Sequence, residues 1–159
     1  MHGKALLKAL ELVRRCEDVP WYGVGAVIVD ERGEVCSSGY TNEVRGSDGS
    51  SIHAEELAII RAISEGVDLR QGTLYSTLEP CSERSSEKLS CSRRIIESGI
   101  RRVVFGAKEP FDPALGIVCQ GAENLSRAGI EVIELEELSD VCLREAVRRS
   151  LNSSLRSGS

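Results

Sequence analysis

The sequence predicts an α/β fold, a three-layer α/β/α sandwich with a mixed five-stranded sheet. Helix-like and strand-like segments alternate along nearly the whole chain, and a short polar turn joins the first two strand-like segments. Strands joined by a hairpin run antiparallel, whereas strands separated by helices run parallel with right-handed crossovers. The 159 residues also match the size of one domain. We therefore expect a single domain over residues 1–150 and a mobile, serine-rich tail over residues 151–159.

The first half of the chain predicts two helices and two strands. Gly3–Cys16 carries leucines at helical spacing with Lys and Arg between them, which is typical of an amphipathic helix. The apolar run Val24–Asp30 predicts a buried strand, and Val35–Tyr40 returns as a second strand after a turn. A polar loop over residues 42–51 precedes a predicted helix at Ile52–Glu65. The apolar face of that helix is expected to carry Leu57, Ile60 and Ile63.

The second half continues the alternation of strands and helices. The predicted strands are Gly72–Leu78, Arg102–Gly106 and Ile130–Leu135. The predicted helices are Ser92–Ser98, Gly121–Ala128 and Ser139–Leu151, with Ser139 as an N-cap. Gly99 and Gly129 follow two of these helices, where glycine commonly ends a helix.

Composition limits the classes of partner that the chain can have. The formal net charge is -5, and proteins that grip phosphate backbones are usually basic because counterion release drives that binding. Nucleic acid is therefore disfavoured, and a small-molecule substrate is expected. No apolar run reaches the length of a membrane span, and the charged N-terminus does not resemble a signal peptide. We expect a cytoplasmic protein whose six scattered cysteines are reduced.

The chemically informative residues are the triplet HAE at 53–55, the triplet EPC at 79–81, and Cys91. Their order matches the H-x-E…P-C-x-x-C signature of zinc-dependent deaminases. A catalytic zinc takes three protein ligands and leaves a fourth position for water. We predict that His53, Cys81 and Cys91 bind Zn²⁺. Glu55 is predicted to be catalytic, carrying the proton of the water to the ring nitrogen and the leaving amine.

The spacing of the two cysteines departs from this signature, since nine residues and not two separate Cys81 from Cys91. A longer loop can still close on a metal because the entropy cost of closure grows only logarithmically with length. The cysteines at positions 16, 36, 119 and 142 are interpreted as packing residues, and Glu56 as a solvated helix position.

Several segments resemble the deaminase domains of riboflavin biosynthesis, within the cytidine deaminase-like superfamily of zinc-dependent deaminases. Those domains also extend the gap between the cysteines with a run that begins EPCS, as residues 79–82 do. The similarity continues through SGIRRVV at 98–104, EPFDP at 109–113 and AGIEV at 128–132. It covers roughly residues 4–135. The run CSERSSEKLSC at 81–91 has no histidine, and it looks closer to the fungal type than to the bacterial one.

The resemblance implies a hydrolytic deaminase that releases ammonia from an aminopyrimidine-type ring. Diaminohydroxyphosphoribosylaminopyrimidine is the expected substrate, Zn²⁺ the cofactor and a homodimer the expected assembly. Three alternatives stay open. The first is a deaminase of another nucleotide, nucleoside or base, of cytosine, guanine or secondary-metabolite type. The second is a tRNA or single-stranded DNA deaminase, and the third is a non-enzymatic protein with a structural zinc.

Further residues are candidates for substrate contacts, each with a second interpretation. Asn42 lies where the superfamily often holds a sugar or ring group, or it is a turn residue. Trp21 stacks on a heterocycle or packs against the first helix. The backbone N–H of Ala54 is expected to face a ring carbonyl. The basic residues of the two polar loops bind a phosphate or are solvated: Arg45, Arg84 and Lys88.

Overall fold

The computed structural model describes residues 2–17, 19, 21–84, 88–110, 116, 118–148 and 150–151. Beyond Leu151, the predicted mobile tail lies outside the described residues, as does most of the run EPFDP. The helices are α1 (His2–Val13), α2 (Ala54–Ser64), α3 (Cys91–Ser98), α4 (Gly121–Arg127) and α5 (Ser139–Arg148). The strands are β1 (Gly25–Val29), β2 (Val35–Tyr40), β3 (Thr73–Leu78), β4 (Arg102–Ala107) and β5 (Glu131–Glu134). Two short 3-10 helices occupy Leu69–Gln71 and Glu136–Leu138.

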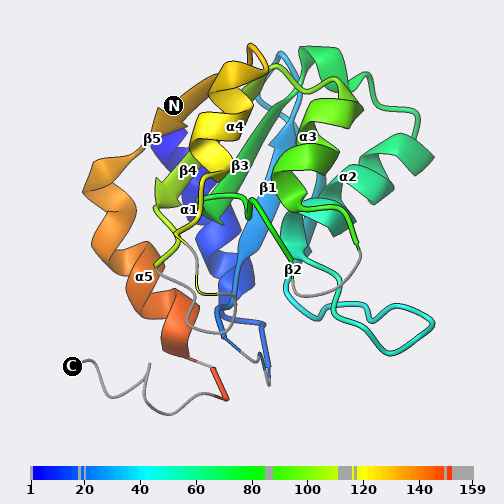
Figure 1. Ribbon diagram of the computed structural model, residues 1–159. Coiled ribbons are helices and arrows are strands. Elements are labelled where there is room, and N and C mark those ends of the chain that lie inside the picture. Colours follow the sequence, from blue (N-terminus) through cyan, green and yellow to red (C-terminus); the bar gives the residue numbers. More distant parts are fainter. Residues whose placement is uncertain are drawn as a thin grey trace.

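The five strands form one mixed sheet in the order β2-β1-β3-β4-β5 (Figure 1). β1 runs antiparallel to both of its neighbours, whereas β3, β4 and β5 run parallel. β1 and β2 form the predicted hairpin, closed at its turn by the Asp30 N–H, which donates to the Glu34 carbonyl at 2.9 Å. The predicted fold class is confirmed.

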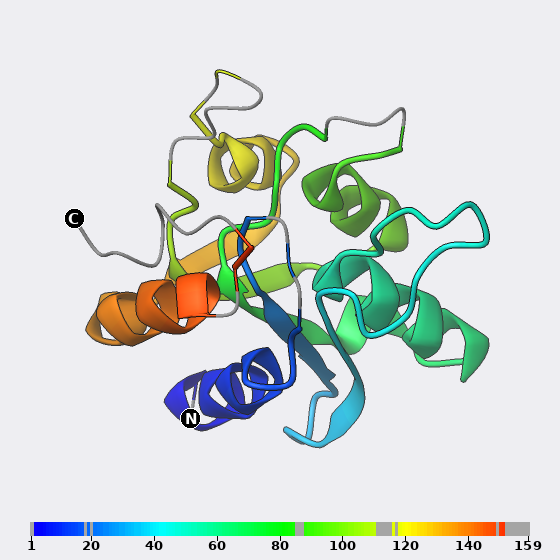
Figure 2. The ribbon, with the colours of Figure 1, turned by 90° about the horizontal axis from the view of Figure 1, so that it is seen from below.

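Helices cover both faces of the sheet, with α1 and α5 on one face and α2, α3 and α4 on the other (Figure 2). The strands supply alternate residues to the two cores, because successive side chains of a strand point to opposite faces. Ala26 and Ile28 of β1 belong to the core under α2, α3 and α4. Val27 and Val29 belong to the core under α1 and α5. Among the described residues, no helix has both the length and the apolar character that a bilayer crossing requires.

The buried face of α2 differs from the prediction. Leu57 is buried, but Ile60 and Ile63 are 46% and 59% exposed. The apolar residues buried on this helix are mostly small: Ala54, Leu57, Ala58, Ile59 and Ala62. This face of α2 lies close against the backbone of β2. A Cβ atom at Gly39 would lie only 2.8 Å from the carbonyl oxygen of Ala54.

Two predicted helix ends are confirmed, and one predicted N-cap is wrong. Gly99 and Gly129 adopt positive φ angles of 89° and 86°, the left-handed conformation that ends a helix at little cost for glycine. Ser139 was expected to cap α5 from outside. It instead has helical dihedral angles and is the first residue of α5, because the 3-10 helix at Glu136–Leu138 leads directly into it.

Candidate metal centre

Three predicted ligands come together at the end of β3. His53 is the residue immediately before α2, Cys81 lies three residues after β3, and Cys91 is the first residue of α3. The Nδ1 atom of His53 lies 3.7 Å from the Sγ of Cys81 and 3.3 Å from the Sγ of Cys91. The Ser92 N–H donates to the Cys81 carbonyl at 3.1 Å, which joins the two ends of the inter-cysteine segment. In open α/β sheets, the carboxyl ends of the strands are the usual place for a binding site.

The geometry of this cluster fits a tetrahedral zinc ion. Its three ligand atoms lie within 4.8 Å of one another. Zinc bonds of about 2.3 Å to sulfur and about 2.0 Å to nitrogen at a tetrahedral angle separate a sulfur from a nitrogen by roughly 3.5 Å. The observed separations of 3.7 and 3.3 Å bracket that value. One imidazole and two thiols are also a donor set that zinc prefers.

The two thiols share negative charge unequally. Hydrogen bonding with Cys91, helped by the nearby His53, holds the pKa of Cys81 well below its usual value. The Cys91 N–H also donates to the Cys81 Sγ at 3.2 Å. The pKa of Cys91 is raised, first by its hydrogen bond with Cys81 and then by burial. One thiolate and one retained proton are therefore favoured without a metal, and a divalent cation would displace that proton.

Glu55 lies beside the three predicted ligands but is not part of their cluster. Its side chain is buried, and its Oε1 accepts a hydrogen bond from the Ser76 hydroxyl at 2.8 Å. Burial raises the pKa of Glu55, and the charge of Cys81 raises it further. A raised pKa brings a carboxyl group closer to what proton transfer in catalysis requires.

Two carboxyl groups near the cluster, the buried Glu79 and the half-buried Glu109, were not among the predicted site residues. Glu79 accepts N–H groups of Glu109 at 3.3 Å and of Ala122 at 3.0 Å, so it ties the end of β3 to β4 and α4. Burial, with a smaller effect of the charge on Cys81, raises the pKa of Glu109 to about 7. Both residues lie in segments already quoted from the sequence, EPC at 79–81 and EPFDP at 109–113. Those segments gave the two glutamates no specific role, because Glu-Pro pairs are common in loops.

The start of α4 packs directly on the residue before Cys81. A Cβ atom at Gly121 would lie 1.7 Å from the Pro80 carbonyl oxygen, so only glycine permits this approach. We predict that Gly121→Ala lowers the free energy of unfolding by about 1–3 kcal/mol, as overpacking does in other cores. Urea unfolding measures this loss. Gly3→Ala is the control, because nothing lies within 4 Å of a Cβ there. Equal unfolding midpoints for the two variants would contradict the predicted contact.

Asn42 lies in a turn after β2, which agrees with its interpretation as a turn residue. Its φ angle of 63° is unusual for a residue other than glycine. Its Oδ1 accepts the Ser51 hydroxyl at 2.7 Å. Its Nδ2 is buried and finds no hydrogen-bond acceptor among the described residues. The amide therefore presents an unused donor.

The three basic candidates occupy different environments. Arg45 is exposed and forms an isolated bridge with Ser51. Lys88 contacts the hydroxyl of Ser50, which joins the two polar loops. Arg84 is neither a solvated residue nor one on an open rim, because only 6% of its side chain is exposed. Its guanidinium forms hydrogen bonds within the protein: Nη1 donates to Glu56 and Nη2 donates to the Ser51 carbonyl, both at 2.9 Å.

The remaining predictions have mixed outcomes. Glu56 was expected to be solvated, and this was wrong, because the residue is only 4% exposed and pairs with Arg84 and Arg94. Ala54 is buried as the first residue of α2, where the helix N–H groups have no intrahelical acceptor. Trp21 is half-buried before β1. Three of the four remaining cysteines are buried, as packing residues should be, and one is half-buried: Cys16, Cys119, Cys142 and Cys36.

Comparisons with known proteins agree with this geometry. The model of the cytidine and deoxycytidylate deaminase zinc-binding region matches residues 1–107. A diaminohydroxyphosphoribosylamino-pyrimidine deaminase of Schizosaccharomyces pombe is 41% identical over 150 residues, which are 92% of this chain and 35% of the relative. The chain thus spans about a third of that relative's length.

Solved structures show the same similarity. A diaminohydroxyphosphoribosylaminopyrimidine deaminase/reductase of Thermotoga maritima is 34% identical with a TM-score of 0.74, covering 91% of this chain and 39% of that one. The Rib2 deaminase of Aspergillus oryzae, solved in complex with DARIPP, is 28% identical with a TM-score of 0.75, covering 96% and 93% of the two chains. The family model matches more than half of the chain, and the fold and cluster are those expected of it. The chain therefore belongs to the cytidine and deoxycytidylate deaminase zinc-binding family, and it resembles the deaminases of riboflavin biosynthesis within the cytidine deaminase-like superfamily.

Proposed function

We propose that the protein is a zinc-dependent hydrolytic deaminase of an aminopyrimidine-type ring. Its proposed substrate is diaminohydroxyphosphoribosylaminopyrimidine, and its products are ammonia and the corresponding oxo compound. The observation that carries the proposal is the three-ligand cluster with a buried, non-ligating Glu55 beside it. Among the described residues, this cluster has three metal-ligating side chains and not four, which favours a catalytic over a structural zinc. The 41% identity to a curated deaminase supports the choice of substrate.

His53, Cys81 and Cys91 would hold the zinc. When bound, zinc lowers the pKa of a water molecule toward neutrality and so supplies a nucleophile at neutral pH. Glu55 would take one proton of the attacking water to the ring nitrogen, and it would then move the second proton of that water to the departing amine. The bond from the ring carbon to the amine breaks as a carbonyl replaces it, so water and substrate are converted to ammonia and product. The Ser76 hydroxyl would orient the Glu55 carboxylate throughout.

Two groups would orient the ring. The buried Nδ2 of Asn42 would donate to an acceptor of the substrate, since its Oδ1 is already engaged by Ser51. The N–H of Ala54, at the N-terminus of α2, would donate to a ring carbonyl. Trp21 and the loops that carry Arg45 and Lys88 are proposed to contact the remainder of the substrate, while Arg84 is withdrawn from this role by its protein contacts.

Asn42→Gly tests the proposed role of Asn42 in substrate binding apart from any effect on the stability of the fold. Glycine adopts the φ angle of 63° without strain, so the free energy of unfolding should fall only by the loss of the Ser51 hydrogen bond, about 1 kcal/mol. Loss of one amide donor is expected to raise KM about 10-fold, which corresponds to one typical hydrogen bond. Steady-state kinetics with urea unfolding on the same preparation measures both quantities. An unchanged KM would remove Asn42 from the site.

The direct test is ammonia release by the purified zinc-loaded protein. Its substrates are diaminohydroxyphosphoribosylaminopyrimidine, dCMP, cytidine, cytosine, guanine and single-stranded oligonucleotides. We expect one zinc per chain and turnover of the first compound. Turnover of another compound alone would keep the chemistry and change the substrate. A zinc-loaded protein with no turnover on any of them would favour a structural zinc.

We further propose that the protein acts as a cytoplasmic homodimer and that residues 1–150 fold as one domain. Light scattering coupled to size-exclusion chromatography gives the oligomeric state. A monomer that retains full activity would refute the dimer as the functional unit.

A further inference from the structure

Glu56 makes three contacts through one carboxylate. Its Oε1 accepts the His53 N–H at 3.2 Å and the Arg84 guanidinium at 2.9 Å. Its Oε2 pairs with the Nη2 of Arg94 at 3.0 Å. Only 5% of the Glu56 side chain is exposed, so water contributes little to its solvation. The carboxylate is therefore satisfied by protein groups alone.

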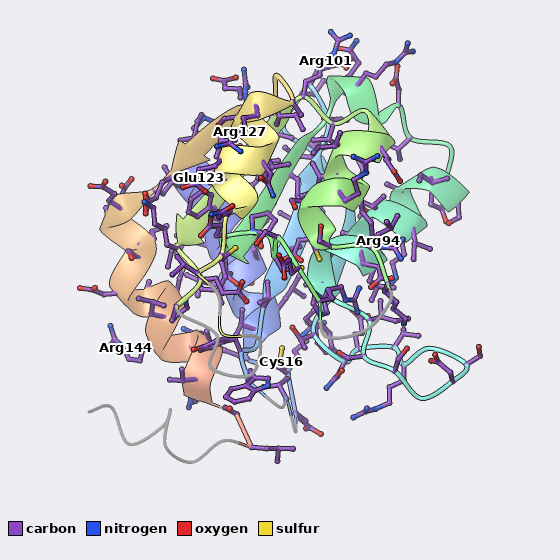
Figure 3. The ribbon with its side chains drawn as sticks, in the orientation of Figure 1. Cys16, Arg94, Arg101, Glu123, Arg127 and Arg144 are labelled. Atoms are coloured by element: carbon purple, nitrogen blue, oxygen red, sulfur yellow. The ribbon has the colours of Figure 1, made fainter. Side chains whose placement is uncertain are left out.

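These three partners belong to three different ligand-bearing segments. His53 is itself a predicted ligand, Arg84 lies three residues after Cys81, and Arg94 lies three residues after Cys91. Arg94 extends from α3 toward the side where α2 lies (Figure 3). One carboxylate thus contacts every segment that contributes a ligand.

Arg84 adds a second connection between two of these segments. Its Nη2 donates to the Ser51 carbonyl at 2.9 Å, two residues before His53. The guanidinium fork therefore spans the backbone before α2 and the Glu56 carboxylate on α2. A lysine ammonium lacks this planar fork and cannot reproduce both contacts in the same geometry. Arg94 contacts Glu56 through one nitrogen, and 28% of its side chain is exposed, so a lysine at this position could keep the contact more easily.

A role in fold stability alone explains this arrangement poorly. Taking charges out of water is costly, and replacing a buried ion pair with apolar side chains is often neutral or stabilising. Groups that hold metal ligands in place, in contrast, commonly affect metal affinity strongly without touching the metal. The contacts of Glu56 converge on the segments of the three ligands, which is what such a group requires.

We propose that Glu56 is a positioning residue that fixes the relative placement of His53, Cys81 and Cys91 by joining their three segments through Arg84 and Arg94. This inference rests on the proposed zinc site and on no assumption about the substrate. It predicts that loss of the Glu56 charge weakens zinc binding, and that the two arginines differ in their tolerance of lysine.

The experiment measures the zinc dissociation constant of each purified variant by competition with a chromophoric chelator. Glu56→Gln preserves size and is expected to raise that constant about 10- to 100-fold. Arg84→Lys is expected to have a comparable effect, whereas Arg94→Lys should change it less. If Glu56→Gln does not yield folded protein, Arg94→Gln provides the same comparison at a more exposed position.

Two controls separate positioning from general destabilisation. Glu97→Gln removes the partner of an exposed ion pair on α3, at 3.1 Å from Arg93. Leu6→Ala removes packing in the core on the opposite face of the sheet. We expect Leu6→Ala to lower the unfolding midpoint while leaving the zinc dissociation constant within twofold of wild type. Glu97→Gln should alter neither quantity.

The outcomes distinguish this inference from the proposed function. Wild-type zinc affinity in Glu56→Gln, alongside tight binding by wild type, would refute the positioning role and leave the zinc site intact. A change in Glu56→Gln no larger than in Leu6→Ala would refute it equally. Absence of zinc binding by the wild-type protein would refute the proposed function itself.

Discussion

Glu55→Gln is expected to lower kcat by about 10²- to 10⁴-fold, the usual contribution of a general acid or base. Glutamine keeps the shape of the side chain and still accepts the hydrogen bond of Ser76, but it cannot take up a proton. Because Glu55 is not a ligand, the zinc content should stay at the wild-type level. Steady-state ammonia release and metal analysis on one preparation test both halves of this expectation.

The matched control for this substitution is Glu65→Gln. Glu65 lies at the C-terminal end of the same helix and is exposed, so the same chemical change is made away from the metal centre. Its kcat should equal that of wild type. Full activity in Glu55→Gln would overturn the assigned proton transfer. Loss of zinc together with activity would indicate that the carboxylate acts mainly on the metal ligands.

Cys91→Ala should abolish both zinc binding and activity. The remaining pair of His53 and Cys81 offers two ligands, whereas catalytic zinc sites use three. The raised pKa of Cys91 also predicts that zinc affinity falls as the pH is lowered, because binding must displace the proton of this thiol. Zinc titration of the apo variant and of the apo wild type between pH 6 and 8 measures both effects.

Zinc should also stabilise the wild-type fold, because a ligand that binds only the folded state raises its unfolding temperature. That increase is expected to disappear in Cys91→Ala and to persist in Cys36→Ala, which removes a half-buried thiol outside the cluster. A zinc-dependent increase in Cys91→Ala equal to that of wild type would exclude Cys91 as a ligand.

Much of the architecture could be predicted because local patterns and long-range structure agree. Three local signals predicted structure that the fold contains: the alternation of helices and strands, the hairpin turn, and the glycines that end two helices. The motif at 53–55 and the cysteines at 81 and 91 were sufficient to predict a cluster, because together they match the signature of a zinc-binding family.

The errors have a common physical origin in contacts between distant segments. Periodicity assigned Ile60 and Ile63 to the buried face of α2, but the close approach at Gly39 selects the side with small residues. In the sequence, Glu56 and Arg84 look like ordinary surface charges. In the structure they form an ion pair across 28 residues of sequence, and both side chains are buried. No local pattern indicates such a pairing.

The cysteines differ in burial, so their rates of alkylation can report which parts of the fold open. Burial raises the pKa of Cys16 and of Cys142 to about 11, so few of these sulfurs are thiolates at neutral pH. Alkylating reagents attack the thiolate, and they must also reach it. In the zinc-loaded native state, where the metal would protect Cys81 and Cys91, iodoacetamide should modify the half-buried Cys36 before Cys16 or Cys142, and labelling at Cys142 should proceed only as fast as α5 separates from the sheet. Mass spectrometry of the labelled peptides would then time the opening of the α1 and α5 layer, with Cys16 reporting on the end of α1 and Cys142 on α5.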